Sequence, residues 1–280
     1  MSAFSPLEPS ADATMPLTGE RTVPGLAEEN YWFRRHEVVY QQLAGRCAGR
    51  DVLEAGSGEG YGADLIAGVA RRVVGLDYDE SAVAHVKARY PRVDMLQGNL
   101  ADLPFEAGTF DVVVNFQVIE HLWDQGQFVA ECARVLRPSG VLLMSTPNRI
   151  TFSPGRNTPI NPFHTRELNA AELTELLTDN GFAVEAMLGV FHGPRLAELD
   201  ARHGGSIIDA QIDRALADAP WPAELLADIT SIRTDDFDLL EARDIPRSLR
   251  SPPQAGGPPA PASRDIDESL DLVAIAVRRD

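Results

Sequence analysis

The stretch Asp51–Gly62, with the sequence DVLEAGSGEGYG, constrains the fold of this chain most strongly. Its first residues predict a short buried strand, and the apolar, Ala-rich sequence ADLIAGVA that follows predicts a helix. Between the two stand glycines at alternate positions, Gly56, Gly58 and Gly60. Glycine lets the backbone turn sharply and lets a ligand lie against it, while the helix behind presents its N-terminus. The stretch therefore predicts a ligand-binding loop between a strand and a helix.

Strands and helices alternate after this loop. Apolar strands are expected at residues 72–77, 93–97, 110–116, 141–145, 182–191 and 270–277, with helices at 81–90, 125–136 and 170–177. The continuous apolar run FDVVVNF at 110–116 is typical of a parallel strand that is covered on both faces. The pattern predicts a doubly wound α/β sheet, whose ligands bind at the carboxyl ends of the strands.

We expect six segments along the chain. They are a disordered tail (1–17), an N-terminal helical lid (18–48), the α/β core (49–192), a helical insertion (193–250), a flexible Pro/Gly-rich loop (251–264) and a last strand of the core (265–280). The aromatic, basic cluster 31–36 in the lid could contact the ligand or pack on the core. The insertion could cover an acceptor or form the interface of a homodimer.

Composition excludes several classes of partner. The 280 residues carry a formal net charge of −17, which argues against a nucleic-acid partner because an acidic surface repels phosphates. Cys47 and Cys132 are far apart and predict neither a disulfide framework nor a CxxC metal site. We see no basic, apolar leader and no stretch of about 18 apolar residues, so we expect a cytoplasmic protein without a membrane partner.

Two carboxylates flank the glycine loop and select its ligand. A nicotinamide dinucleotide calls for GxGxxG, and Tyr61 stands at the sixth position here. Glu54, just before the glycines, could accept a hydrogen bond from an ammonium group but suits a pyrophosphate poorly. Asp77, at the end of the second strand, is suited to the two hydroxyls of a ribose. An adenosine that carries an amino acid fits both carboxylates.

Six segments, VLEAGSGEGYG, VVGLDYD, GNLADLPF, FDVVVNFQVIEHL, RVLRPSG and STPNR, resemble the successive motifs of the class I S-adenosylmethionine-dependent methyltransferases. The resemblance implies a Rossmann-like, mostly parallel sheet of seven strands with an antiparallel last strand. It also implies S-adenosyl-L-methionine as the cofactor. The residues it assigns to cofactor binding are Glu54, Gly56, Ser57, Gly58, Gly60, Asp77, Tyr78, Asn99, Leu100, Asn115 and Gln117.

The same resemblance implies a role for each of these positions. Glu54 and the backbone of the glycine loop hold the methionine part, and Asp77 holds the ribose. Tyr78 packs on the adenine, residues 99–100 read the adenine edge, and residues 115–117 line the sulfonium.

Further segments, GERTVPG, ENYWFRRHEVVY, SPGRNTPINPFHTREL and FHGPRL, resemble actinobacterial, especially mycobacterial, methyltransferases associated with methylated polysaccharides such as the methylglucose lipopolysaccharides. This implies O-methylation of a sugar hydroxyl and a carbohydrate acceptor. One rival is O-methylation of a small phenol or quinone precursor. Another is a non-catalytic S-adenosylmethionine-binding protein, which the presence of both Glu54 and Asp77 disfavours.

The acceptor chemistry centres on three residues, Glu120, His121 and His164. A sugar hydroxyl is a weak nucleophile, so a base or a metal ion is expected. The segment QVIEH resembles an ExxEH segment that binds Mg²⁺ in some methyltransferases, with Gln117 in place of the first acid. We therefore expect the three residues to act as catalytic groups, with one histidine as base, or as ligands of Mg²⁺. Alternatively, they only hydrogen-bond their own loop.

The expected insertion offers further candidates. Oligosaccharides are commonly held by an aromatic platform and carboxylates, which Trp221, Asp200 and Asp209 could provide. His192 and His203, near its start, could bind acceptor hydroxyls or cap a turn.

Overall fold

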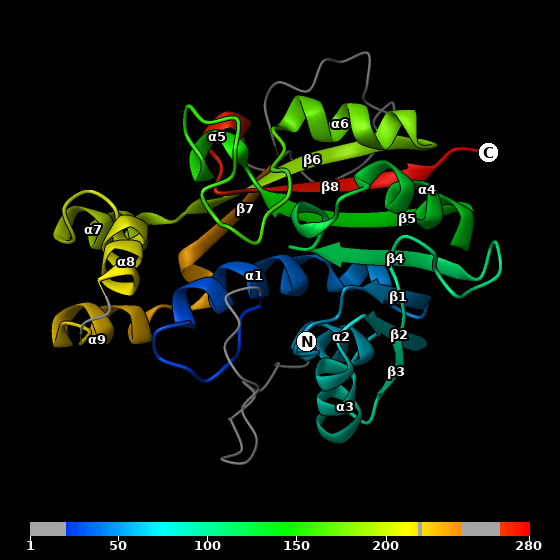
Figure 1. The fold of residues 1–280 in the computed structure, drawn as a ribbon, viewed down its shortest axis with the longest axis horizontal. Helices are drawn as coiled ribbons and strands as arrows, with labels where there is room; N and C mark the ends of the chain where they lie inside the picture. The colour runs from blue at the N-terminus through cyan, green and yellow to red at the C-terminus, as the bar shows by residue number, and fades with distance from the viewer. Residues whose placement is uncertain (1–20, 218–219, 242–263) are drawn as a thin grey trace, which may run out of the picture.

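An eight-stranded sheet carries the fold. The computed structural model describes residues 21–217, 220–241 and 264–280, in which the strand order is β3-β2-β1-β4-β5-β8-β6-β7 (Figure 1). The strands are β1 (Asp51–Ala55), β2 (Arg72–Asp77), β3 (Val93–Gln97), β4 (Phe110–Phe116), β5 (Leu136–Pro147), β6 (Phe182–His192), β7 (Phe237–Glu241) and β8 (Asp271–Arg278). All strands expected from the sequence are present. Strand β5 begins earlier than expected, because the residues before the turn at Ser139, whose φ is 60°, also belong to the strand.

Strand direction agrees with the sequence prediction, but the strand number does not. Strands β1 to β5 pair in parallel, while β8 pairs antiparallel with both β5 and β6, as expected for the last strand. The prediction of seven strands is wrong, because β7 pairs antiparallel with β6 at the edge of the sheet. This strand lies within the segment 193–250, which was predicted to be helical. Only Phe237 in it is fully buried, so it lacks the apolar pattern of an inner strand.

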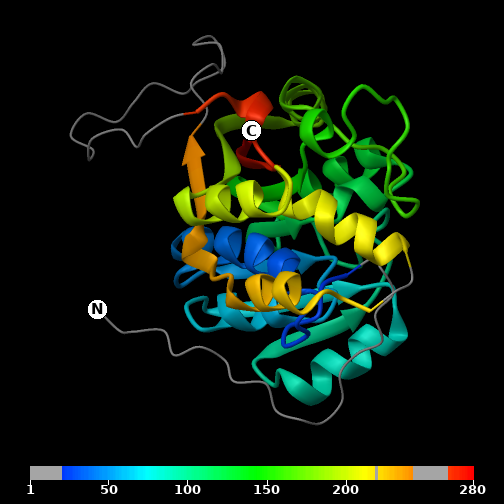
Figure 2. The ribbon, with the colours of Figure 1, turned by 90° about the vertical axis from the view of Figure 1, so that its left-hand side faces the viewer.

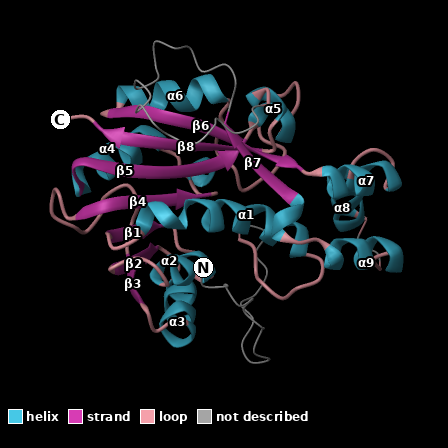
Figure 3. Cartoon of the chain, turned by 180° about the vertical axis from the view of Figure 1, so that it is seen from behind, coloured by secondary structure: helices cyan, strands magenta, loops and turns pink. Residues whose placement is uncertain are grey.

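Helices cover both faces of the sheet (Figure 3). They are α1 (Asn30–Leu43), α2 (Tyr61–Ala67), α3 (Glu80–Arg89), α4 (Gln125–Val135), α5 (Arg149–Phe152), α6 (Ala170–Asp179), α7 (Pro194–Arg202), α8 (Ile207–Leu216) and α9 (Ala223–Ser231). One core cluster contains residues of α1, α2 and α3, and the other contains residues of α4 and α6. Val112 and Val114 point into the first cluster and Val113 into the second, which confirms that the run at 110–116 is covered on both faces.

Helix α1 is tied both to the sheet and to the segment after α9. Its Arg35 donates from Nε to Asp271 Oδ2 on β8 at 2.7 Å, and both side chains are almost fully buried. Its Asn30 donates to the carbonyl of Ile232, just after α9, at 2.9 Å. Of the predicted aromatic cluster, Tyr31 and Phe33 are buried, so these two rings pack on the core.

Three helices, α7, α8 and α9, follow β6. Figure 2 shows them in front of α1 and the sheet, on the side towards which β4 points in Figure 1. The predicted tail (1–17) and, except for residue 264, the predicted loop (251–264) lie outside the described residues. Among the described residues, the helices are all too short or too polar to cross a lipid bilayer.

Candidate active site

The glycine loop leaves open space at its centre. Gly56, Gly58 and Gly60 have φ values of 86°, 54° and 95°, which only glycine adopts readily. A Cβ added at Gly56 would lie 2.6 Å from Val118, and one at Gly60 would lie 2.5 Å from Val86. A Cβ at Gly58 would meet nothing within 4 Å. The outer glycines are thus packed against the protein, while Gly58 faces the space in which a ligand can lie.

Glu54 is a buried carboxylate with an unsatisfied oxygen. It lies next to the last residue of β1 with 1% of its surface exposed, and its Oε2 accepts a 2.6 Å hydrogen bond from the Ser57 hydroxyl. Its Oε1 is buried and has no hydrogen-bond partner among the described residues. Burial raises the pKa of Glu54 to about 7. Since buried polar atoms are normally paired, a cationic donor in the loop would complete this site.

Asp77 connects β2 to the glycine loop. Its Oδ2 accepts from the backbone N–H of Gly58 at 2.8 Å, and its Oδ1 accepts from the backbone N–H of Asp79 at 3.0 Å. These bonds hold the carboxylate beside the open centre of the loop. Each oxygen keeps a lone pair, so the carboxylate can accept further hydrogen bonds from hydroxyls.

The predicted adenine contacts lie at the ends of β2 and β3, which pair as far as Asp77 and Gln97. Tyr78 is 67% exposed, and its carbonyl accepts from the Gln97 side chain at 3.0 Å. Asn99 is exposed and its Oδ1 accepts from the Ala101 N–H at 3.0 Å, whereas Leu100 is buried. The structure therefore brings Tyr78 and residues 99–100 to one corner of the sheet.

The end of β4 is strained. Gln117 has a φ of 57°, an unfavourable backbone conformation for a residue with a Cβ, of the kind that clusters at functional sites. Its N–H donates to the Ser145 carbonyl at 2.9 Å and its Nε2 to the Ser145 hydroxyl at 3.2 Å. Asn115 is fully buried and donates to the Ala55 carbonyl at 2.7 Å, but its Oδ1 has no partner in the described ranges. A second unpaired oxygen thus lies one strand away from Glu54.

Glu120, His121 and His164 come together, although 43 positions separate the two histidines. The first two belong to the 3₁₀ turn η2 (Ile119–His121) after β4, and His164 lies in the loop after α5. Nitrogen and oxygen atoms of the three side chains all lie within 4.8 Å of one another. The Thr165 N–H donates to the Glu120 carbonyl at 2.7 Å and holds the two segments together.

Neighbouring carbonyl and amide groups fix the tautomers of both histidines. His121 Nδ1 lies 3.0 Å from the Phe163 carbonyl; because a carbonyl only accepts, Nδ1 carries the proton and Nε2 the lone pair. The Phe163 N–H donates to Asn161 Oδ1 at 3.0 Å, which turns the Asn161 amide nitrogen towards His164 Nε2 at 3.1 Å. His164 Nδ1 then donates to Glu167 Oε1 at 2.7 Å. His121 Nε2 is therefore the better proton acceptor of the two.

Burial favours the neutral forms of Glu120 and His121. Glu120 is 1% exposed, and burial raises its pKa to about 8, against the hydrogen bond from the Thr146 hydroxyl at 3.1 Å. Burial and the nearby His164 lower the pKa of His121. A neutral imidazole with a fixed lone pair is suited to take a proton from a hydroxyl.

The same three residues fit the predicted Mg²⁺ poorly. Mg²⁺ prefers oxygen ligands in near-octahedral geometry, whereas this cluster supplies one carboxylate and two imidazoles. One imidazole nitrogen, His164 Nε2, already accepts from Asn161. Imidazole suits zinc, copper, iron or nickel better.

Comparisons with known proteins identify the family. A family model described as a methyltransferase domain matches residues 53–144, from β1 through most of β5. A probable S-adenosylmethionine-dependent methyltransferase of Mycolicibacterium smegmatis is 73% identical over 266 residues, which cover 95% of this chain and 96% of the relative. The chain belongs to the S-adenosylmethionine-dependent methyltransferases. S-adenosylmethionine is therefore the methyl donor of this methyltransferase.

More distant proteins share less with this methyltransferase. A ubiquinone biosynthesis O-methyltransferase of Rhizobium etli is 35% identical over 105 residues, covering 36% of this chain and 42% of the relative. The crystal structure of a methyltransferase of Thermotoga maritima, described as a possible histamine N-methyltransferase, matches with a TM-score of 0.56 at 15% identity and covers 89% of this chain and 93% of its own. The second likeness shows the fold alone.

S-adenosylmethionine has groups that fit both Glu54 and Asp77. Its amino-acid part carries an ammonium group, which can donate to the unpaired Oε1 of Glu54. Its ribose carries two hydroxyls, which can donate to Asp77 beside Gly58. The individual contacts of the other predicted cofactor residues stay predictions.

The insertion residues singled out in the sequence have mixed positions. Asp200 accepts from His192 Nδ1 at 2.6 Å and from the Ile207 N–H at 2.9 Å, so both side chains link β6, α7 and α8. Trp221 is partly buried against the core, and Asp209 is exposed in the first turn of α8. A direct contact of Asp200 or His192 with the acceptor gains no support from these bonds.

Sequence reasoning missed Trp123. This side chain is 93% exposed and follows η2 by two positions in the chain. Phe163, whose carbonyl positions His121, is also 43% exposed. Single aromatic residues near a motif give no signal of exposure in the sequence, because most of them are buried.

Proposed function

We propose that this methyltransferase transfers the methyl group of S-adenosylmethionine to a hydroxyl of a carbohydrate acceptor, and that His121 takes the hydroxyl proton. The observation that carries the proposal is the fixed lone pair on His121 Nε2, which follows from the 3.0 Å contact of Nδ1 with the Phe163 carbonyl. Glu120, beside it, is neutral at neutral pH and does not compete for the proton.

The proposed step is an in-line displacement. The acceptor oxygen forms a bond to the methyl carbon, the carbon–sulfur bond breaks, and its electron pair stays on the sulfur as a thioether. The hydroxyl proton passes to His121 Nε2. Because a sugar hydroxyl is a weak acid and a weak nucleophile, it needs this base and close alignment with the methyl group.

Two observations support a neutral sugar as acceptor. Trp123, two positions after His121 in the chain, offers an exposed aromatic side chain, and sugar rings commonly pack their C–H faces on such rings. The net charge of −17 disfavours an anionic acceptor. The segments that resemble polysaccharide-associated methyltransferases point in the same direction.

A phenol or quinone precursor is the second candidate. The Rhizobium etli relative is named for a ubiquinone biosynthesis O-methyltransferase, although only 36% of this chain matches it. The exposed Trp123, Phe163 and Ile160 would also suit an apolar acceptor.

A methyl-transfer assay with radiolabelled S-adenosylmethionine tests both candidates. We expect transfer to glucose and glucose oligomers, and a much larger loss of sugar methylation in His121→Ala than in Arg46→Leu, which removes only a surface pair with Glu185. Transfer to phenols alone would reject the sugar proposal. The predicted Mg²⁺ is tested in the same assay by chelation, and activity that survives thorough chelation would remove it.

A further inference from the structure

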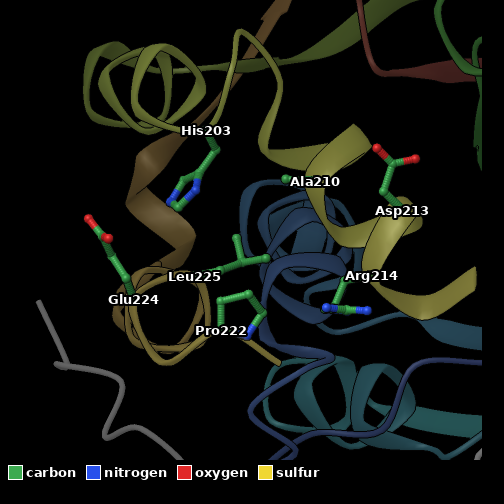
Figure 4. A pocket seen from close by; sticks show the side chains of 7 residues that line it. All are labelled: His203, Ala210, Asp213, Arg214, Pro222, Glu224 and Leu225. Atoms are coloured by element: carbon green, nitrogen blue, oxygen red, sulfur yellow. The ribbon is translucent and has the colours of Figure 1, made fainter. Parts of the chain in front are cut away.

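A cavity of about 460 Å³ lies between α8 and α9, away from the histidine cluster. This volume falls within the range of about 300–1,000 Å³ that is usual for small-molecule sites. Figure 4 shows the side chains around it, with His203 on one side and Pro222 and Leu225 on the other. The lining residues are His203, Ala210, Asp213, Arg214, Pro222, Glu224 and Leu225.

One polar residue of the lining, Arg214, has a buried atom without a partner among the described residues. The Nε atom of Arg214 is buried and has no hydrogen-bond partner in the part of the chain that the structure describes. Within the same ranges, no side chain forms a hydrogen bond or ion pair with the carboxylate of Asp213 or Glu224. A buried donor without a partner is costly, so a ligand with acceptor groups would relieve it.

The chemistry of the lining favours a neutral, hydroxylated ligand. The lining contains two carboxylates and one guanidinium, so the cavity gives an anionic ligand such as a phosphate no net attraction. A hydroxyl both donates and accepts, and can therefore pair with Asp213 and with Arg214. Ala210, Pro222 and Leu225 supply apolar contacts for the C–H groups of a ring. His203 is held in place by Asp228, at 2.8 Å from its Nε2.

We propose that this cavity binds a sugar ring of the acceptor other than the ring that is methylated. The proposal rests on the proposed function in taking the acceptor to be a carbohydrate. The cavity is built from α8, α9 and the end of α7, whereas the reacting groups lie in η2 and the loop after α5, and the two sites share no residue. An acceptor that fills both sites is therefore an oligosaccharide, and the cavity selects for its length.

The experiment compares a glucose monosaccharide with a glucose oligomer long enough to reach both sites. We expect wild type to prefer the oligomer and Arg214→Leu to lower the ratio of their kcat/KM values about tenfold, the effect of about 1.4 kcal/mol in binding. Arg46→Leu, which removes the same charge from a surface pair with Glu185, leaves the ratio unchanged. Glu224→Gln, nearly equal in shape to the native residue, repeats the test should Arg214→Leu fail to fold.

Calorimetry of the glucose oligomer on unlabelled protein with S-adenosylhomocysteine gives a readout that does not depend on turnover. Weaker binding to Arg214→Leu than to Arg46→Leu supports the cavity. An unchanged ratio in both cavity variants, or displacement of the oligomer by amines but not by monosaccharides, overturns it. If the wild-type protein methylates no sugar, the proposed function is wrong but the cavity proposal is not yet rejected. Oligomer binding that depends on Arg214 would still support a sugar site in the cavity.

Discussion

The cofactor side and the acceptor side of this methyltransferase are built in different ways. The cofactor side consists of one loop between β1 and α2 and the neighbouring strand ends, held by backbone bonds such as that from Gly58 to Asp77. The acceptor side joins η2 to a loop about 40 positions later and adds three helices after β6. A loop of consecutive residues can bind a cofactor that is the same in every reaction. Side chains from distant segments can be replaced one by one to suit a different acceptor.

The largest expected effect is a loss of methyl transfer to the acceptor with cofactor binding left intact. In His121→Ala the proton acceptor is lost, and we expect kcat for sugar methylation to fall about 10²–10⁴-fold, the usual contribution of a general base. Affinity for S-adenosylmethionine, measured by calorimetry, should stay the same because the cofactor loop is untouched. A parallel loss of cofactor affinity would show that the two sides are not separate.

A change at Glu54 should weaken cofactor binding instead. Glu54→Gln keeps the shape but removes the charge that pairs with the cofactor ammonium, a bond worth about 1.5–3 kcal/mol. We expect affinity for S-adenosylmethionine to fall roughly tenfold to hundredfold. Glu185→Gln, at an exposed carboxylate, is the matched control and should bind as wild type does.

The pH dependence of cofactor binding tests the same role of Glu54. Burial raises the pKa of Glu54 to about 7 in the ligand-free protein, so below that pH the ammonium must displace a proton. Affinity should then fall by up to about tenfold for each pH unit below 7, and this slope should vanish in Glu54→Gln. An equal slope in the variant would assign the proton to another group.

The stability of the ligand-free protein should depend on pH in the opposite way to cofactor affinity. Because the folded pKa of Glu54 lies above its usual value of 4.5, the protonated form favours folding, and this contribution is lost as the pH rises from about 4.5 through 7. Glu54→Gln should therefore be more stable than wild type above pH 7, as measured by urea unfolding. A destabilised variant would mean that the charge is paired in the folded protein.

The smallest expected effect concerns the edge of the acceptor side. Trp123 is 93% exposed, so Trp123→Ala should change the free energy of unfolding by no more than about 0.5 kcal/mol. The KM for the acceptor should rise roughly fivefold, as expected for the loss of about 1 kcal/mol of aromatic contact. Leu96→Ala removes another exposed apolar side chain and serves as control. Equal KM values in both variants would place the acceptor elsewhere.

The sequence predicts the strands and helices of the α/β core well because its signals are local. Residues 110–116 form a strand with the expected bounds, since an apolar run of that length has few other folds, and the capping box of Asn169 and Glu172 forms at the start of α6. Strand β7 was missed because it is a partly exposed edge strand whose partner cannot be read from its own residues. Helix α7 was missed because it buries only Leu196 and Leu199.

The acceptor side is less accessible to such reasoning. The meeting of His121 with His164 was expected from their positions after two neighbouring strands, and the structure brings them within reach. Which nitrogen keeps a lone pair depends on a carbonyl at Phe163 and an amide at Asn161, and no local pattern specifies those contacts.

The buried pair of Arg35 and Asp271 also sets an order of events during synthesis. These residues are separated by 236 positions, and β8 lies between β5 and β6. The ribosome therefore releases α1 and seven strands before β8, which fills the gap in the sheet and supplies the carboxylate for Arg35. Until then an arginine and two apolar strand edges stay exposed, a state prone to aggregation and recognised by chaperones. The nascent chain should bind chaperones until residues near 278 have left the ribosome.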